Sequence, residues 1–368
     1  MAMISLIFWI FFSVAVPVLG DQLLLSFDEN IQSVGRIFRT EKNSFQADWP
    51  NSGITFQFQA NSNQASLNLS FGDCGGNCHA FVAIDVNCAR FNKYEISPST
   101  VVSSSFLTEP GQFYEVSLRK ITEAHFSEAN GILEFASITI DGGNALPEED
   151  FKEICPKKKN ILVFGDSFTA AYGVDQLDPC GFTAATEDVT HGYAYLAAQE
   201  VSADVHIIAW SGKGAVRNNG DSNPTSADPL PTYYNRTLAN LAAPDLNTNY
   251  WDPKSFSPDL TIVMLGTNDY SPPTHPSDEQ FVSGLSSFLK TIQGDYPSSK
   301  ILALCAPGSS SLQCRNIHAA ALAVDEAEYF EIPADVWQGG VGCSGHPYAT
   351  TQQNMAAAIL PTVQKLLQ

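Results

Sequence analysis

The chain has 368 residues, of which 44% are hydrophobic and 16% are charged, so it is long enough for two domains and its composition excludes intrinsic disorder. It carries 19 basic and 39 acidic residues, a formal net charge of -20. A surface of this sign repels nucleic-acid phosphates and anionic lipid headgroups, so neutral or cationic partners are favoured and neither nucleic acid nor a membrane is an expected partner.

Residues 1–20 are apolar almost throughout and predict a secretory signal peptide. Small residues stand at the −3 and −1 positions of a cleavage site in Val18-Leu19-Gly20. No Lys or Arg precedes the apolar run, which leaves an uncleaved signal anchor as the alternative. No second apolar run is long enough to cross a membrane. We therefore expect a secreted, extracellular protein whose fold excludes residues 1–20.

Eight cysteines fit an oxidising compartment, although their pairing cannot be deduced from sequence. Cys305 and Cys314 bracket a Pro-Gly-Ser loop that a disulfide could close. Cys74, Cys78 and Cys88 lie close together, with His79 beside Cys78. Disulfides are the favoured interpretation there and a zinc site is the alternative. We expect no metal or other cofactor, and nothing in the sequence predicts an oligomeric state.

Residues 21–148 consist of short segments with apolar side chains at every second position, separated by turn signals such as Asn130-Gly131. The clearest segments are 54–58, 65–69, 113–118 and 132–138. No stretch of helical periodicity interrupts them. This pattern predicts an all-β sandwich or jelly-roll domain over residues 21–148.

Residues 149–368 instead alternate strands with helices. Strands are expected at 160–164, 204–209, 260–265 and 300–304, and helices at 191–201, 277–292 and 350–367. This alternation predicts an α/β domain with three α/β/α layers around a parallel sheet, which collects ligands at the carboxyl ends of its strands. The boundary between the two domains is expected at 148/149.

Four polar blocks follow these expected strands or precede the last helix. They are Gly165-Asp166-Ser167, Ser211-Gly212-Lys213-Gly214, Gly266-Thr267-Asn268-Asp269 and Ser344-Gly345-His346-Pro347. Acyl transfer requires a nucleophile, a base and oxyanion donors, and these blocks supply all three. Taken singly each block also fits an ordinary turn or helix cap, and Lys213 fits a structural cation.

In this order, the four blocks resemble those of the SGNH (GDSL) hydrolases. The front half is similar to the jelly-roll domain of the family-2 carbohydrate esterases, and that likeness is carried by Gly35-Arg36, residues 49–53 (WPNSG), residues 119–124 (RKITEA) and residues 140–143 (IDGG). The block 211–214 followed by Arg217-Asn218 is also similar to the second block of that family. The resemblance implies a metal-independent carboxylic ester hydrolase, of the acetyl xylan esterase type, that removes O-acetyl groups from acetylated plant polysaccharides or oligosaccharides such as xylan or mannan.

The resemblance also implies a role for each matching residue. Ser167 would be the nucleophile and His346 the general base and later acid. The oxyanion hole would comprise the Ser167 and Gly212 amides and the Asn268 side chain. Asp166 and Asp269 would be supporting residues that hold the loops rather than react.

The chain departs from the family pattern before the histidine. Many SGNH hydrolases have an Asp three residues earlier and some family-2 esterases have one two residues earlier, whereas Cys343 and Ser344 occupy those places here. The Nδ1–H of His346 must then be oriented by a backbone carbonyl, by Ser344 or by Asp335. We predict a Ser–His dyad with an acetyl-serine intermediate.

Three aromatic residues, Tyr270, Trp210 and Trp337, adjoin the blocks and are possible sugar-binding platforms, with core packing as the alternative. Two other functions stay open. One is a lipid esterase or thioesterase of the SGNH class. The other is a secreted glycan-binding protein with a catalytically weak hydrolase half.

Overall fold

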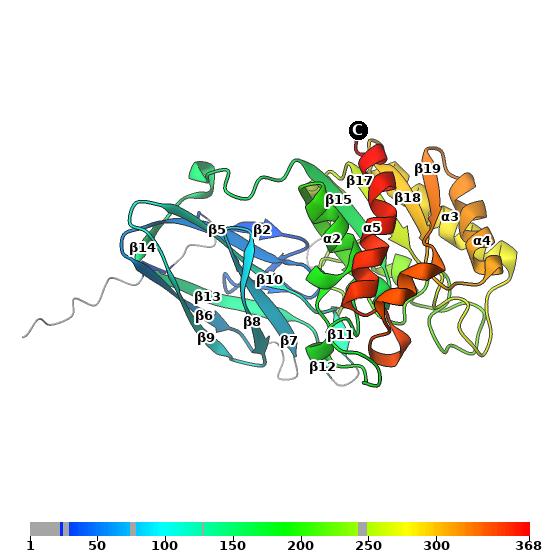
Figure 1. Ribbon diagram of the computed structural model, residues 1–368, viewed down its shortest axis with the longest axis horizontal. Helices are drawn as coiled ribbons and strands as arrows, with labels where there is room; N and C mark the ends of the chain where they lie inside the picture. The colour runs from blue at the N-terminus through cyan, green and yellow to red at the C-terminus, as the bar shows by residue number, and fades with distance from the viewer. Residues whose placement is uncertain (1–22, 25–28, 74–78, 127–128, 242–248) are drawn as a thin grey trace, which may run out of the picture.

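The computed structural model describes residues 23–24, 29–73, 79–126, 129–241 and 249–368. The predicted signal peptide (1–20) and the cysteines at 74 and 78 lie outside the described residues. Figure 1 shows an all-β domain, coloured blue to green, beside an α/β domain coloured green to red. The predicted fold class, an all-β domain followed by a three-layer α/β/α domain with a parallel sheet, is therefore confirmed.

The front domain is a sandwich of two antiparallel sheets, each of six strands. The first sheet has the order β3-β4-β13-β6-β9, with β1 on β13; its strands are β1 (Leu23–Leu24), β3 (Phe38–Arg39), β4 (Phe45–Ala47), β6 (Gln64–Phe71), β9 (Val101–Leu107) and β13 (Leu133–Asp141). The second has the order β14-β5-β10-β7-β8, with β2 on β5; its strands are β2 (Gln32–Val34), β5 (Gly53–Ala60), β7 (Ala80–Val86), β8 (Ala89–Ile96), β10 (Phe113–Lys120) and β14 (Gly143–Ala145). A small hairpin pairs β11 (His125–Phe126) with β12 (Ala129–Asn130).

Period-two alternation explains how the sandwich forms its core. In β6 every second residue, from Ala65 to Phe71, is buried, and the side chains between them are less buried. The buried face of each sheet therefore meets the other sheet in one apolar core. The four strand segments predicted in this domain are confirmed as parts of β5, β6, β10 and β13.

The second domain contains a parallel sheet of order β16-β15-β17-β18-β19. Its strands are β15 (Lys159–Gly165), β16 (Ala203–Ala209), β17 (Leu260–Met264), β18 (Lys300–Cys305) and β19 (Ala327–Glu331). Its α-helices are α1 (Ser167–Ala170), α2 (Tyr193–Glu200), α3 (Asp278–Asp295), α4 (Ser311–Leu322) and α5 (Ala349–Leu366). Short 3-10 helices occur at η1 (Glu148–Asp150), η2 (Ala184–Thr186), η3 (Val189–His191), η4 (Leu230–Tyr233), η5 (Pro253–Ser255), η6 (Ala334–Gly339) and η7 (Cys343–Gly345).

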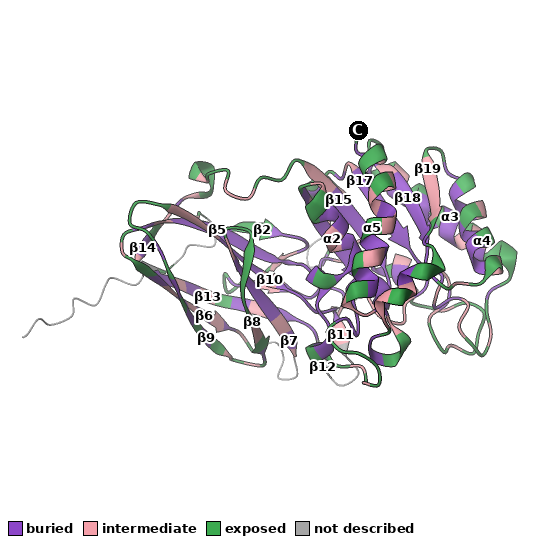
Figure 2. Ribbon diagram, viewed as in Figure 1, coloured by how far each residue is buried: buried purple, intermediate pink, exposed green. Residues whose placement is uncertain are grey.

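Both faces of this sheet are covered by helices. Along β15, Ile161 and Val163 join a core that includes α2 and α5, and Leu162 and Phe164 join the opposite core with α3 and α4. Figure 2 shows β15, β17 and β18 mostly in purple, with exposed green segments on the surrounding helices. The four predicted strands and three predicted helices are confirmed; Ser277 caps α3 in a capping box with Gln280.

The two domains share their cores. Ile121 of the β domain is buried in the core beneath α2 and α5, and Trp49 is buried in the core beneath α3 and α4. Asn51 adds a buried hydrogen bond of 2.7 Å from Nδ2 to the Val205 carbonyl. The predicted boundary at 148/149 lies in the segment between β14 and β15.

Disulfides tie several of these segments together. Cys88 pairs with Cys155 and is therefore not available to zinc, whereas the expected Cys305–Cys314 bridge is present. A third bridge, Cys180–Cys343, joins segments 163 residues apart. Within the described residues, no helix has both the length and the apolar character that crossing a bilayer requires.

We expect Ile121→Ala to destabilise the protein by about 2–5 kcal/mol, because it removes a fully buried side chain and leaves a cavity between the domains. Urea unfolding followed by tryptophan fluorescence measures the change. Val101→Ala is the control, since Val101 is 67% exposed and its truncation should change stability by less than about 0.5 kcal/mol. Equal stability of the two variants would contradict a shared core.

Candidate active site

The nucleophile turn forms where β15 ends. Asp166 caps the one-turn helix α1, and its Oδ1 accepts a hydrogen bond of 3.1 Å from the Phe168 N–H. Gly165 is required because a Cβ there would lie 1.9 Å from Thr169 Oγ1. The turn therefore places Ser167 at the carboxyl edge of the sheet.

His346 meets Ser167 from the other end of the chain. Its Nε2 lies 2.8 Å from Ser167 Oγ, and its Nδ1 lies 3.2 Å from the Cys343 carbonyl and 3.3 Å from the Ser344 carbonyl. A carbonyl oxygen can only accept, so Nδ1 carries the proton. The lone pair of Nε2 therefore faces the Ser167 hydroxyl and can accept its proton.

Of the three orienting partners considered from sequence, the backbone carbonyl is the one observed. The Ser344 side chain is engaged elsewhere: its Oγ accepts from the Tyr172 hydroxyl at 2.9 Å and donates to the Cys180 carbonyl at 3.2 Å. Asp335 is exposed on η6 and makes no hydrogen bond to His346. The imidazole is thus held without a carboxylate.

Burial dominates the electrostatics of this imidazole. It lowers the pKa of His346 to about 4, and the hydrogen bonds to the two carbonyls only partly oppose the shift. The rings of Tyr172 and Phe168 pack edge-on against it, with centroids at 4.3 Å and 5.5 Å. His346 is therefore neutral across the physiological pH range and suited to act as a base.

The Cys180–Cys343 disulfide holds the loop that carries His346. Cys343 is three residues before His346, and its own carbonyl accepts from Nδ1. The following residue, Ser344, has a left-handed backbone (φ 52°) and donates its N–H to Asp178 Oδ1 at 3.1 Å. Covalent and hydrogen-bonded contacts to the 178–180 segment therefore position both carbonyls.

Gly212 and Asn268 lie on the two neighbouring loops. Gly212 has a φ of 79° just beyond β16, and its carbonyl accepts from the Asn219 N–H at 2.8 Å. The Asn268 amide donates to the Lys213 carbonyl at 2.8 Å and to Asp166 Oδ2 at 3.2 Å. Both protons of the Asn268 side-chain amide thus have acceptors. For Asn268 to donate to an oxyanion, one of these hydrogen bonds must break, and the longer one, to Asp166, is the weaker of the two.

The two supporting carboxylates are buried beneath these loops. Asp269 accepts the N–H groups of Ala215, Val216 and Arg217 at 2.9, 2.7 and 2.9 Å. Burial raises the pKa of Asp269 to about 6, with these N–H bonds opposing it, and burial raises the pKa of Asp166 to about 7. Each carboxylate therefore fixes loop backbone and lies beneath the cavity rather than in its lining.

Ser167, His346, Gly212 and Asn268 line one open cavity of about 570 Å³. The structure brings together all four residues predicted to form the reactive centre, although their chemical roles stay predictions. The remaining lining is formed by Phe168, Tyr172, Phe182, Ser211, Asn219, Thr267, Ser271, Ser344 and Gly345.

The aromatic rings of this cavity are not those proposed from sequence. Trp210 packs against Trp49 and Tyr233 at the domain junction, and Trp337 packs on Phe168 while donating to the Pro307 carbonyl at 3.2 Å. Tyr270 lines a neighbouring cavity of about 330 Å³. Tyr172 and Phe182 could not be predicted from sequence as cavity residues, because neither adjoins one of the four polar blocks. Phe182 is brought to the cavity by the disulfide between Cys180 and Cys343, a pairing that the sequence does not reveal.

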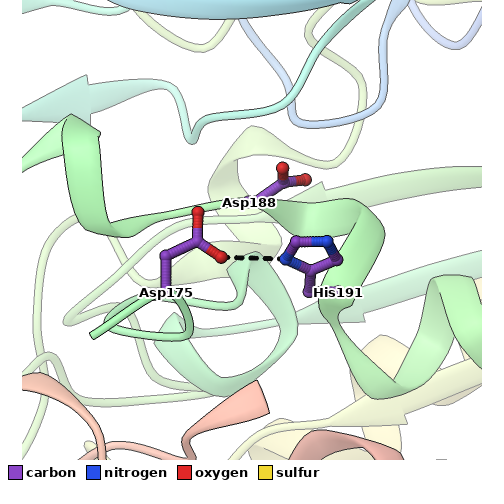
Figure 3. Close-up of side chains that lie close together, drawn as sticks. All are labelled: Asp175, Asp188 and His191. Carbon is purple, nitrogen blue, oxygen red and sulfur yellow. Dashed lines mark hydrogen bonds and ion pairs between the residues drawn. The ribbon is translucent and has the colours of Figure 1, made fainter. Parts of the chain in front are cut away.

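One cluster away from this cavity has the residue types of a metal site. Asp175, Asp188 and His191 bring their ligand atoms within 4.8 Å of one another (Figure 3). Lys93 of the β domain already lies 2.9 Å from Asp175 and 3.7 Å from Asp188, and Arg90 lies 3.4 Å from Asp188. The protein's own cations neutralise these carboxylates, so the cluster is an ionic contact between the domains.

Comparisons with known proteins were made for the whole chain. Residues 163–337 match the GDSL-like Lipase/Acylhydrolase family. An acetylxylan esterase/glucomannan deacetylase from Cellvibrio japonicus is 26% identical over 278 residues, which are 75% of this chain and 71% of that protein. The cellulase/esterase CelE from Acetivibrio thermocellus is 26% identical over 344 residues, which are 90% of this chain but only 39% of that longer protein.

A solved structure is similar over both domains. It is a carbohydrate esterase family 2 enzyme plus carbohydrate-binding domain from Corynascus thermopiles (Myceliophthora fergusii). It is 26% identical, aligns with a TM-score of 0.72, and the match covers 92% of this chain and 99% of that chain. The likeness therefore extends well beyond the four blocks.

We expect His346 and His191 to titrate on opposite sides of the ordinary histidine pKa of about 6.5. Burial places the pKa of His346 near 4, whereas the hydrogen bond to Asp175 raises the pKa of His191. Imidazole nitrogen shifts followed by NMR between pH 3 and 9 would show it. Asp175→Asn is the control that should lower the His191 value and leave His346 unchanged. A cationic His346 at pH 6 would contradict the desolvated site.

Proposed function

Because the chain belongs to the GDSL-like lipase/acylhydrolase family and is a carboxylic ester hydrolase, we propose that it removes O-acetyl groups from plant-type polysaccharides such as xylan or mannan. The observation that carries this proposal is the 2.8 Å contact between Ser167 Oγ and an imidazole nitrogen that must be unprotonated. Acyl transfer needs a nucleophile beside a base whose tautomer is set, and this contact provides both.

Acylation starts when Ser167 Oγ attacks the acetyl carbonyl and His346 Nε2 takes the hydroxyl proton. The positive charge formed on the imidazole is stabilised by the Cys343 and Ser344 carbonyl oxygens, which accept hydrogen bonds from Nδ1. When the tetrahedral intermediate collapses, His346 returns the proton to the departing sugar oxygen. The products of this half are acetyl-Ser167 and a free sugar hydroxyl.

Deacylation repeats the sequence with water. His346 takes a proton from the attacking water, the acetyl-serine ester bond breaks, and the proton passes to Ser167 Oγ. The Ser167 and Gly212 amides and the Asn268 side chain hold the oxyanion in both halves. Asn268 contributes by exchanging its 3.2 Å bond to Asp166 for one to the developing negative charge.

The lining of the cavity supports a sugar ester over a long acyl chain. Asn219 and Thr267 offer an amide and a hydroxyl group around the reactive pair, which suits the hydroxyls of a glycan. Tyr172 and Phe182 stack edge to face beside them and offer an apolar ring face. We infer that these two rings, more than Trp210 or Trp337, contact the sugar. A preference for long-chain esters over acetyl esters would instead support the lipid esterase alternative.

Secretion is part of the same proposal. Three disulfides join described cysteines, and disulfides persist in oxidising compartments. A polymeric plant-type substrate is also met outside the cell. Residues 1–20 would then be removed as a signal peptide, with the uncleaved anchor as the alternative that amino-terminal sequencing of the secreted protein would distinguish.

We expect Ser167→Ala to lower acetate release from acetylated xylan by about 10³-fold or more, because the nucleophile is lost. Acetate is measured by an enzyme-coupled assay, and thermal unfolding verifies that the variant is folded. Ser103→Ala, on the β domain surface, is the matched serine control and should behave as wild type. Equal release by wild type and Ser167→Ala would remove the proposal. Saturable glycan binding without turnover by wild type would support the glycan-binding alternative.

We expect the double variant Cys180→Ser/Cys343→Ser to lose about 10²-fold in kcat with little change in KM, because a displacement of about 1 Å in a catalytic group costs this much. The bridge fixes the carbonyl that orients His346. Cys305→Ser/Cys314→Ser removes another disulfide of the same domain and is the matched control, expected to retain kcat. A similar kcat in both double variants would argue against a positioning role for the Cys180–Cys343 bridge.

A further inference from the structure

A buried carboxylate of the β domain contacts the active-site loops but takes no part in the mechanism above. Glu123 lies in the loop after β10 and is fully buried. Both of its carboxylate oxygens accept hydrogen bonds from one residue of the hydrolase domain. Oε2 accepts the Ser211 N–H, and Oε1 accepts the Ser211 hydroxyl at 2.6 Å. Two charge-assisted bonds to a single residue fix its position and its rotation.

Ser211 shares a peptide unit with Gly212, so its orientation decides where the Gly212 N–H points. The space beside Gly212 is open, because a Cβ built on it would approach only Asn219, at 3.9 Å. A glycine at a φ of 79° is also free to rotate about its backbone. The hydrogen bonds around this peptide therefore set the direction of the amide: Ser211 to Glu123, the Lys213 N–H to the Trp210 carbonyl, and the Asn219 N–H to the Gly212 carbonyl.

We propose that Glu123 is a positioning residue for the oxyanion hole: by holding Ser211 through two hydrogen bonds, the β domain aims the Gly212 amide at the developing oxyanion. The inference rests on the proposed ester hydrolysis and deepens it. It makes the β domain part of the machinery that stabilises the transition state, where the aim of a donor matters most.

Two ionisable residues, Glu187 and Lys120, act on the Glu123 carboxyl group. Glu187 Oε1 accepts the Glu123 N–H at 2.5 Å. Burial raises the pKa of both groups, that of Glu123 to about 7 and that of Glu187 well above its ordinary value, and the two hydrogen bonds from Ser211 oppose the shift at Glu123. Lys120, the cation facing both, donates to the Thr122 side chain and to the Glu123 carbonyl at 2.6 Å.

The test compares Glu123→Ala with Glu123→Gln on p-nitrophenyl acetate and on a fluorophosphonate probe that labels the active serine. Alanine removes both bonds, so kcat and the labelling rate should fall together by about 10–100-fold, less than the 10²–10³-fold cost of deleting an oxyanion donor. KM should stay within about threefold. Glutamine can accept from the Ser211 N–H and donate to its hydroxyl, so it should restore kcat to within about threefold of wild type.

Two further variants separate positioning from folding. Ser211→Ala removes one of the two bonds from the other partner and should lower kcat severalfold, with no further loss when it is added to Glu123→Ala. Arg90→Ala breaks an interdomain contact to Asp188 and Thr190 and should leave kcat unchanged. Thermal unfolding of each variant accompanies the kinetics.

Several results would overturn the inference. Wild-type kcat in folded Glu123→Ala would remove it, as would a loss confined to KM or an equal loss in Glu123→Gln and Glu123→Ala. Fully additive losses in the double variant would also remove it. Absence of Ser167-dependent turnover and labelling in wild type would overturn the proposed function together with this inference, so the two failures are distinguishable.

Discussion

Buried carboxylates that accept backbone N–H groups are the constraint on which this site depends. Asp166 caps the nucleophile turn, Asp269 accepts three amides of the 215–217 loop, and Glu123 holds Ser211. Burial makes each ionised form costly, which is why their pKa values rise to between about 6 and about 7, and the N–H donors offset part of that cost. Loop geometry and carboxylate charge therefore depend on each other. The loop N–H groups stabilise the ionised carboxylates, and the carboxylates hold the loop backbone by accepting these N–H groups.

Much of the fold and the residues of the reactive centre could be predicted from sequence. Strand periodicity is strong in β15, β16 and β17, and the carboxyl ends of adjacent parallel strands meet at one edge, so the blocks carrying Ser167 and Asn268 had to be near each other. The partner of His346 Nδ1 could not be predicted, because it depends on the left-handed backbone of Ser344 and on Cys343 pairing with Cys180, one of 105 arrangements of eight cysteines. Glu123 lies in the 119–124 stretch that carries the family resemblance, but its contact with Ser211 could not be predicted, because that contact depends on how the two domains pack.

Replacing the usual carboxylate by two carbonyls changes the electrostatic balance of the reaction. A neighbouring carboxylate would stabilise the imidazolium formed during acylation, whereas carbonyl dipoles do so less, and burial of His346 opposes the charge further. The neutral base is thus available down to low pH, but its protonated form is harder to reach. More of the transition-state stabilisation must then come from the oxyanion side, where charge is also formed. Exact direction of the Gly212 and Asn268 donors accordingly matters more here than in an enzyme with a full triad.

This requirement explains why the β domain is packed so closely against the hydrolase domain. Glu123 stands between Ile121 and Ala124, and these neighbours are buried in the cores on opposite faces of the parallel sheet. The apolar side chains hold the 121–124 segment from both directions, and the carboxylate between them therefore reaches Ser211 in a fixed position. We infer that the front domain supports the oxyanion hole, because its buried Glu123 holds Ser211 in the loop that carries Gly212.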